Sequence, residues 1–161
     1  MQAEINGILT REAIDTLEKL AFVFGYPEDV AAIATDDLCR AGVEFRGPFE
    51  GRLVMGVSWD ALPELTANML GLDESEPLGK TEQQDAMKET LNIICGNILP
   101  VIAGTEAVFD LGAPAVIDDT DLPAAADANL VASAGISLDE GGCTLHFYVK
   151  GGAAQLRRQQ G

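Results

Sequence analysis

The spacing of apolar and polar positions predicts three helices. The first covers residues 11–24, between Thr10 as N-cap and a stop at Gly25. The second runs from residue 59 or 60 to residue 70, where Gly71 can close it. The third and longest extends from Glu82 to at least Leu99. Its start is predicted from Thr81 and Gln84, which have the spacing of a capping box.

Strand-like segments lie between and after these helices. Residues 32–58 predict a hairpin that turns at "GPFEG", and three further strands are predicted at 107–117, 128–138 and 143–150. The tight turn "DEGG" joins the last two strands. Helices interleaved with hairpins indicate an α+β fold, with helices on one face of a largely antiparallel sheet. We expect a single domain over residues 1–152 and a disordered tail over residues 153–161.

Two octapeptides resemble each other. "EKLAFVFG" at 18–25 and "ETLNIICG" at 89–96 share Glu, Leu and Gly at matching positions, and hairpin material follows each one. The pair predicts an internal duplication of a half-domain. Ala21 stands in the first copy where Asn92 stands in the second.

The third helix has two contrasting faces. At 100° per residue, a core-facing stripe is formed by Met87, Leu91, Ile94, Ile98 and Ile102. The opposite face carries Glu82, Asp85, Glu89, Asn92, Ile93 and Gly96. Glu89 and Asn92 are three residues apart and therefore neighbours, and Gly96 lies one turn beyond Asn92.

Polar residues on the outward face of a helix usually do no more than meet solvent. Asn and Gly, however, are poor helix formers, and Gly costs about 1 kcal/mol relative to Ala. The presence of both residues on one face lowers the stability of the helix, and a helix with a purely structural role does not need them. Asn92 and Gly96 therefore remain candidates for a functional role beside Glu89.

Composition narrows the possible partners. The chain has 161 residues, of which 47% are hydrophobic, and a formal net charge of −16. The few scattered basic residues disfavour nucleic acid and acidic membrane surfaces as partners. With no signal peptide or membrane-spanning run, we expect a cytoplasmic protein. Cys39, Cys95 and Cys143 lack the spacing of a disulfide framework or zinc site and are predicted to be buried thiols.

The single histidine, His146, lies in the predicted strand "CTLHFYVK". Cys143, Leu145 and Phe147 alternate as the buried set, so His146 should share the other face with Thr144 and Tyr148. That position predicts a surface or subunit-contact residue rather than a general base.

The segment "ETLNIICG" resembles the Glu-x-x-Asn signature of the CheC/CheX/FliY phosphatases of bacterial chemotaxis. The resemblance covers most of the chain, from the first helix through "FEGRLVMGVSWDALPELTANMLG" to "YVKGG". One intact signature is more similar to CheX than to CheC, whose members commonly carry two. The resemblance implies a CheC-like fold.

It also implies an activity. Family members hydrolyse the aspartyl phosphate of a CheY-type response regulator, which supplies its own Mg²⁺, so no metal is expected in this chain. Asn92 would position the attacking water and Glu89 would dock beside the regulator's active site, with Ile93 and Gly96 as partner-contact residues. Ala21 cannot orient water, so one active site per chain is expected.

The resemblance further implies a homodimer formed through sheet edges. The alternative is a non-enzymatic adaptor or signalling module of the same fold, which binds a response regulator or a flagellar switch component.

Overall fold

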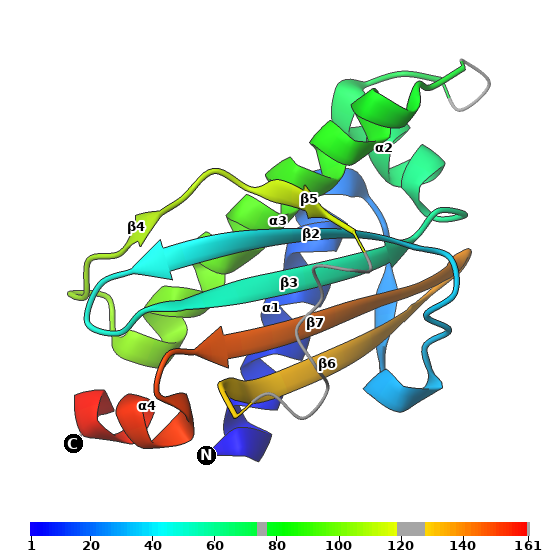
Figure 1. Cartoon of the computed structure of the whole chain (residues 1–161). Helices are drawn as coiled ribbons and strands as arrows, with labels where there is room; N and C mark the ends of the chain where they lie inside the picture. Colours follow the sequence, from blue (N-terminus) through cyan, green and yellow to red (C-terminus); the bar gives the residue numbers. More distant parts are fainter. Residues whose placement is uncertain (74–76, 119–127, 161) are drawn as a thin grey trace.

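The computed structural model describes residues 1–73, 77–118 and 128–160. Its strands form a seven-stranded sheet in the order β1-β6-β7-β3-β2-β4, and β5 also pairs with β2 (Figure 1). Every pairing is antiparallel. The strands are β1 (Gly25–Glu28), β2 (Leu38–Arg46), β3 (Gly51–Ser58), β4 (Asp110–Leu111), β5 (Ala115–Ile117), β6 (Leu130–Leu138) and β7 (Gly141–Val149).

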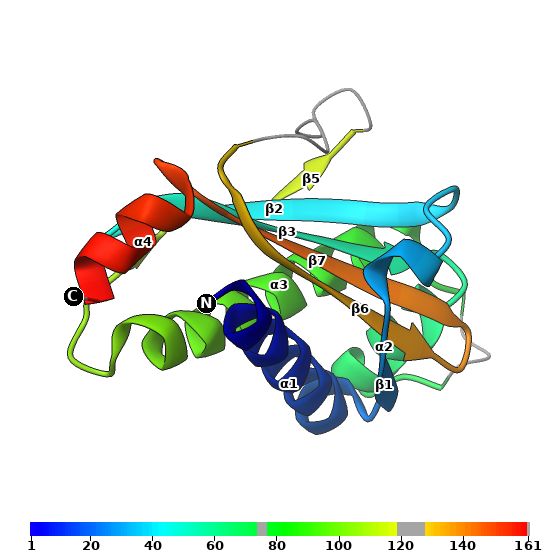
Figure 2. The same cartoon turned by 90° about the horizontal axis from the view of Figure 1, so that it is seen from below.

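The helices are α1 (Gln2–Ala21), the 3-10 turn η1 (Val30–Ala32), α2 (Leu62–Leu70), α3 (Lys80–Ala103) and α4 (Gly152–Gln160). The long helices α1 and α3 lie together on one side of the sheet (Figure 2). Their apolar faces and the inward side chains of the strands form the main core, in which Leu17, Met55 and Phe147 are completely buried. The predicted α+β architecture is confirmed.

The topology repeats itself. Each half consists of a long helix, short edge-strand segments, a hairpin and a shorter helix: α1, β1, β2–β3 and α2, then α3, β4 and β5, β6–β7 and α4. The edge strands of each half pair with the hairpin of the other, because β1 pairs with β6 and both β4 and β5 pair with β2. Strands β3 and β7 meet at the centre. The predicted duplication is thus confirmed at the level of topology.

Several sequence-based boundaries were wrong. Helix α1 begins at Gln2, and Thr10 lies inside it, donating to the Asn6 carbonyl at 2.9 Å instead of capping its start. Helix α3 begins after Gly79, whose N–H donates to Glu82 Oε1 at 3.2 Å. The capping box predicted at Thr81 and Gln84 is therefore displaced by two residues.

The ends of the sheet also differ from the prediction. The strand expected over residues 107–117 is divided into β4 and β5, and the four-residue strand β1 was not predicted.

The tail, expected to be disordered, contains helix α4, in which Leu156 is completely buried against the main core. Leu156 is an apolar residue that docks this segment, in a sequence otherwise made of small or polar residues.

Candidate functional site

Helix α3 presents the predicted faces. All five residues of the core-facing stripe are buried: Met87, Leu91, Ile94, Ile98 and Ile102. On the opposite face Glu89, Asn92 and Gly96 are exposed, while Ile93 is half-buried. The four predicted site residues therefore lie together on one accessible surface, which we call the motif face.

The polar side chains of the motif face are not used by the chain's own structure. Within the described ranges, neither the Glu89 carboxylate nor the Asn92 amide has a hydrogen-bond or ion-pair partner. The nearby Lys88 pairs with Asp85 instead, at 3.2 Å. Both Glu89 and Asn92 remain available to another molecule.

Gly96 leaves open space next to Asn92. A Cβ built on Gly96 would meet no heavy atom of the described residues within 4 Å, so the internal packing of the chain does not require glycine here. Pro100, inside the same helix, lacks the N–H that would otherwise donate to the Gly96 carbonyl. A partner can therefore approach the helix backbone closely at this turn.

Shallow hollows flank the motif face. One, of about 370 Å³, is lined by Asp85, Lys88, Glu89, Asn92 and Pro114. Another lies between α1 and α3, has a volume of about 580 Å³, and includes Ile93, Gly96, Asn97 and Pro100 beside Leu20. The surface around Asn92 is open, which suits docking of another protein better than enclosure of a small substrate.

Two further asparagines, neither of them singled out from the sequence, hold the surrounding elements in place. Asn97 Nδ2 donates to Thr16 Oγ1 at 3.1 Å and so joins α3 to α1. Asn68 Nδ2 of α2 donates to the Ala21 carbonyl at 2.7 Å, which satisfies the last turn of α1. The sequence places these pairs far apart, and only the packed helices bring them together.

The first octapeptide does not form a second site. Ala21 is completely buried, and α1 ends there, so Gly25 already belongs to strand β1. In the second octapeptide Asn92 is exposed and α3 continues past Gly96 to Ala103. The two segments therefore occupy different positions on their helices. Within the described ranges, α3 therefore carries an exposed Glu-x-x-Asn arrangement, and the corresponding segment of α1 does not.

Other reactive groups lie away from the motif face. Burial raises the pKa of Cys95 and of Cys143 to about 12, so these thiols stay protonated at neutral pH. All three cysteines are free and buried, as predicted. In the part of the chain that the structure describes, no group of three His, Cys, Asp or Glu side chains could hold a metal ion. No helix in that part is long and apolar enough to cross a membrane.

The motif face therefore offers one amide, one carboxylate and an approachable backbone. An amide both accepts and donates hydrogen bonds without changing its protonation state, which allows it to orient a water molecule. A carboxylate can pair with a cation on a partner. Together these groups fit a surface that contributes to a reaction centre on another protein.

Comparisons with known proteins identify the family of the chain. Residues 40–134 match the family model described as "Chemotaxis phosphatase CheX". No curated protein matches the chain in sequence.

Solved structures show the same fold. The chemotaxis protein CheX from Desulfovibrio desulfuricans has a TM-score of 0.71 at 17% identity, covering 91% of this chain and 99% of that one. CheX from Vibrio vulnificus has a TM-score of 0.72 at 17% identity, with coverages of 93% and 99%.

A third similar structure is the CheX–CheY–BeF3–Mg²⁺ complex from Borrelia burgdorferi, with a TM-score of 0.63 at 15% identity and coverages of 89% and 96%. At these sequence identities the similarity shows the fold alone. The family model, however, spans more than half of the sequence and includes the whole of α3. The chain therefore belongs to the CheX family of chemotaxis phosphatases.

Proposed function

We propose that this chain hydrolyses the aspartyl phosphate of a CheY-type response regulator, with Asn92 positioning the attacking water. The observation that carries the proposal is the exposed pair of Glu89 and Asn92, which has no partner in the described ranges and lies beside the open turn at Gly96. The complex of CheX with CheY from Borrelia burgdorferi supports the choice of partner.

In the proposed reaction, Asn92 enters the regulator's active site. Its Oδ1 accepts a hydrogen bond from a water molecule and directs the water oxygen at phosphorus, in line with the bond to the aspartate. The new P–O bond forms as the bond to the aspartyl oxygen breaks, which regenerates the carboxylate and releases inorganic phosphate. The water proton leaves with the phosphate or passes to solvent, so Asn92 never needs to act as a base.

The regulator contributes the electrostatic part of catalysis. The presence of Mg²⁺ in the Borrelia burgdorferi complex supports a metal that arrives with the regulator. A metal ion bound to the phosphoryl oxygens neutralises developing charge, so the positioned water is what remains to be supplied. A hundredfold acceleration corresponds to about 2.7 kcal/mol of transition-state stabilisation, which one well-placed water can provide.

Glu89 serves as the docking anchor in this proposal. Its carboxylate pairs with a lysine beside the regulator's active site and fixes the register of Asn92, one helical turn away. Ile93 and Gly96 contact the regulator on either side. An ion pair excluded from water at such an interface contributes more than the ~0–1 kcal/mol of an exposed pair.

We further propose a cytoplasmic homodimer that forms through the sheet edges. At the edges lie β1 on one side and β4 and β5 on the other, and among the described residues each pairs along one side only. Unpaired backbone groups on such strands can bond to a second copy. Light scattering coupled to size-exclusion chromatography measures the mass directly, and a monomeric mass at micromolar concentration would contradict the dimer.

The decisive experiment measures phosphate release from a phosphorylated regulator of the same organism in the presence of Mg²⁺. We expect the wild-type chain to accelerate release, and Asn92→Ala and the near-isosteric Asn92→Asp to abolish the acceleration. Glu89→Gln should weaken binding of the regulator. Glu106→Gln, which removes an exposed carboxylate just beyond α3, is the matched control for the lost charge and should behave as wild type.

Two outcomes would count against the proposal. If Asn92→Ala kept full acceleration, the water-positioning role would be wrong even for a working phosphatase. If the wild type bound regulators of its host without accelerating release from any of them, the chain would be a non-enzymatic adaptor that uses the same face for docking.

A further inference from the structure

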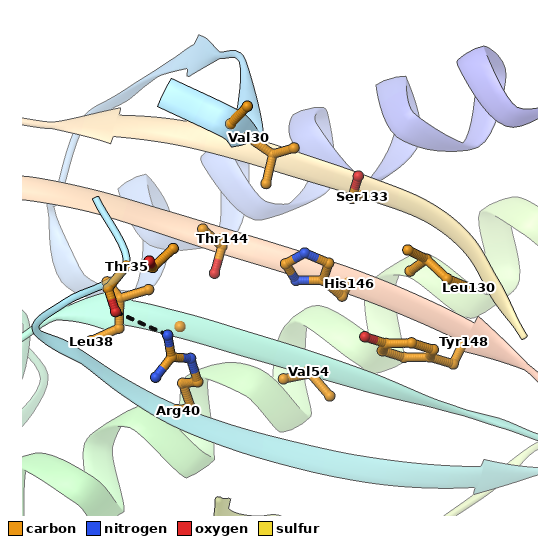
Figure 3. A pocket seen from close by; sticks show the side chains of 12 residues that line it. Val30, Thr35, Leu38, Arg40, Val54, Leu130, Ser133, Thr144, His146 and Tyr148 are labelled. Carbon is orange, nitrogen blue, oxygen red and sulfur yellow. Dashed lines mark hydrogen bonds between the residues drawn. The ribbon is translucent and has the colours of Figure 1, made fainter. Parts of the chain in front are cut away.

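The sheet has a second feature on the face opposite α1 and α3. A hollow of about 410 Å³ opens there, lined by residues of β2, β3, β6, β7 and the η1 region, whose side chains are drawn in Figure 3. Its volume is within the range of small-molecule pockets. The proposed phosphatase reaction makes no use of this hollow.

Strand alternation explains why polar groups gather in the hollow. Residues at every second position of a strand face the same way, so Thr144, His146 and Tyr148 of β7 all point away from the helices, as the sequence predicted. Ser133 joins them from β6, which pairs with β7, and Arg40 joins them from β2, which lies beyond β3.

The hollow depends on a small residue in its floor. A Cβ at Gly56 of β3 would lie 2.8 Å from Thr144 Oγ1 and 3.1 Å from Leu38 Cδ1. Any larger residue at this position would therefore fill the space between β7 and β2. Glycine keeps the sheet surface concave here.

One cationic side chain, Arg40, and one imidazole, His146, line the hollow. Arg40 donates from Nη2 to the Thr35 carbonyl at 3.0 Å, which holds its guanidinium at the rim (Figure 3). Burial, together with the positive charge of Arg40, lowers the pKa of His146. An anion bound between Arg40 and His146 would favour the protonated imidazole and so raise this pKa.

Three polar groups of the hollow can bond to a bound molecule. Within the described residues, the His146 imidazole and the hydroxyls of Ser133 and Thr144 make no side-chain hydrogen bond. These groups face the open space of the hollow, so a molecule bound there can form hydrogen bonds with them. Val54 and Leu130 complete the lining with apolar surface beside the Tyr148 ring.

We propose that this hollow binds a small organic anion, whose charged head lies between Arg40 and His146 and whose apolar part packs on Val54 and Leu130. The hydroxyls of Ser133 and Thr144 orient the head by donating to its oxygens. The ligand class is set by this combination: a carboxylate or phosphate monoester attached to a compact apolar group.

The single histidine makes the proposal directly measurable. Titration of the imidazole by NMR reports His146 alone, because the chain holds no other histidine. Phenyl phosphate is the probe, inorganic phosphate supplies the head without the apolar part, and benzyl alcohol supplies the ring without the charge. We expect millimolar phenyl phosphate to raise the pKa of His146 and to shift backbone amides of β3 and β7. Inorganic phosphate should act more weakly, and benzyl alcohol should leave the pKa unchanged.

Variants distinguish specific binding in the hollow from nonspecific attraction of anions to the protein surface. Arg40→Gln should weaken phenyl phosphate binding by about tenfold or more, because a charge-assisted bond is lost. Arg11→Gln removes the same charge from an exposed position on α1 and should bind as wild type. Val54→Phe, which fills the apolar side of the hollow, should abolish the response while the circular dichroism spectrum stays native.

The proposal would be overturned by an unchanged pKa of His146 at millimolar phenyl phosphate. Equal affinities for Arg40→Gln and Arg11→Gln would also overturn it, as would amide shifts confined to α1 and α3. None of these results bears on phosphate release by the motif face, so the two proposals can fail independently.

Discussion

Glu89, Asn92 and Gly96 share a property that is visible one residue at a time. Each is exposed, the two polar side chains have no partner in the described ranges, and the glycine has open space around it. Asn and Gly are also unfavourable in helix interiors. Nothing in the described packing of the chain therefore explains these residues, whereas the proposed contact with a response regulator would.

A substitution at Gly96 measures how much the glycine destabilises the helix. We expect Gly96→Ala to raise the free energy of unfolding by about 1 kcal/mol, because alanine favours the helix and its Cβ meets no neighbour. The same Cβ would stand between α3 and a docked regulator, so acceleration of dephosphorylation should fall. Urea unfolding and phosphate release measure the two effects separately.

Gly7→Ala on α1 is the matched control. Gly7 is also an exposed helical glycine whose added Cβ would meet nothing within 4 Å. This variant should gain similar stability and keep full activity. If Gly96→Ala were as active as Gly7→Ala, the close approach at Gly96 would not be needed.

At the scale of the element, α3 shows both the power and the limit of sequence patterns. Its buried stripe and exposed motif face follow from helical period alone and were predicted correctly. The start of α3 was not predicted correctly, because its N-cap is Gly79, which has no side chain. The Gly79 N–H donates to Glu82 instead. Strand β1 was missed because its hydrogen bonds go to β6, more than 100 residues later.

The bond between Asn97 and Thr16 could not be predicted for the same reason, and it joins the two long helices. We expect Asn97→Ala to lower the free energy of unfolding by about 1 kcal/mol, since it removes a partner of a buried hydroxyl. Asn92→Ala should cost nothing in the same urea titration, because the Asn92 amide has no bond to lose within the described ranges. Equal destabilisation by the two variants would show that Asn92 has a structural role.

Helix α4 gives a second test at this scale. Leu156 is completely buried, so Leu156→Ala should destabilise the fold by about 2–4 kcal/mol. Arg157→Ala changes the exposed neighbour and should stay within about 0.5 kcal/mol of wild type. Thermal unfolding followed by circular dichroism compares them. If Leu156→Ala melted with the wild type, the segment would be undocked in solution, as the sequence alone suggested.

For the whole molecule, the duplicated topology separates two surfaces. The sheet lies between the motif face on the helical side and the hollow around His146 on the other (Figures 2 and 3). Sequence patterns predicted which residues face outward on each side, since both periods are local. They could not predict the hollow itself, which requires Arg40, Ser133 and His146 from the three strands β2, β6 and β7.

The charge of the whole molecule leads to a final prediction. With 26 acidic and 10 basic residues, the folded chain concentrates negative charge that the unfolded chain spreads over a larger volume. Raising NaCl from 0.01 to 1 M shortens the Debye length from about 30 to about 3 Å, so the melting temperature should rise. Neutralising three exposed carboxylates by Glu18→Gln, Glu106→Gln and Glu140→Gln should raise it at low salt and reduce the response to NaCl. If this triple variant responded to NaCl as strongly as the wild type, the salt effect would come from increased apolar burial and not from charge repulsion.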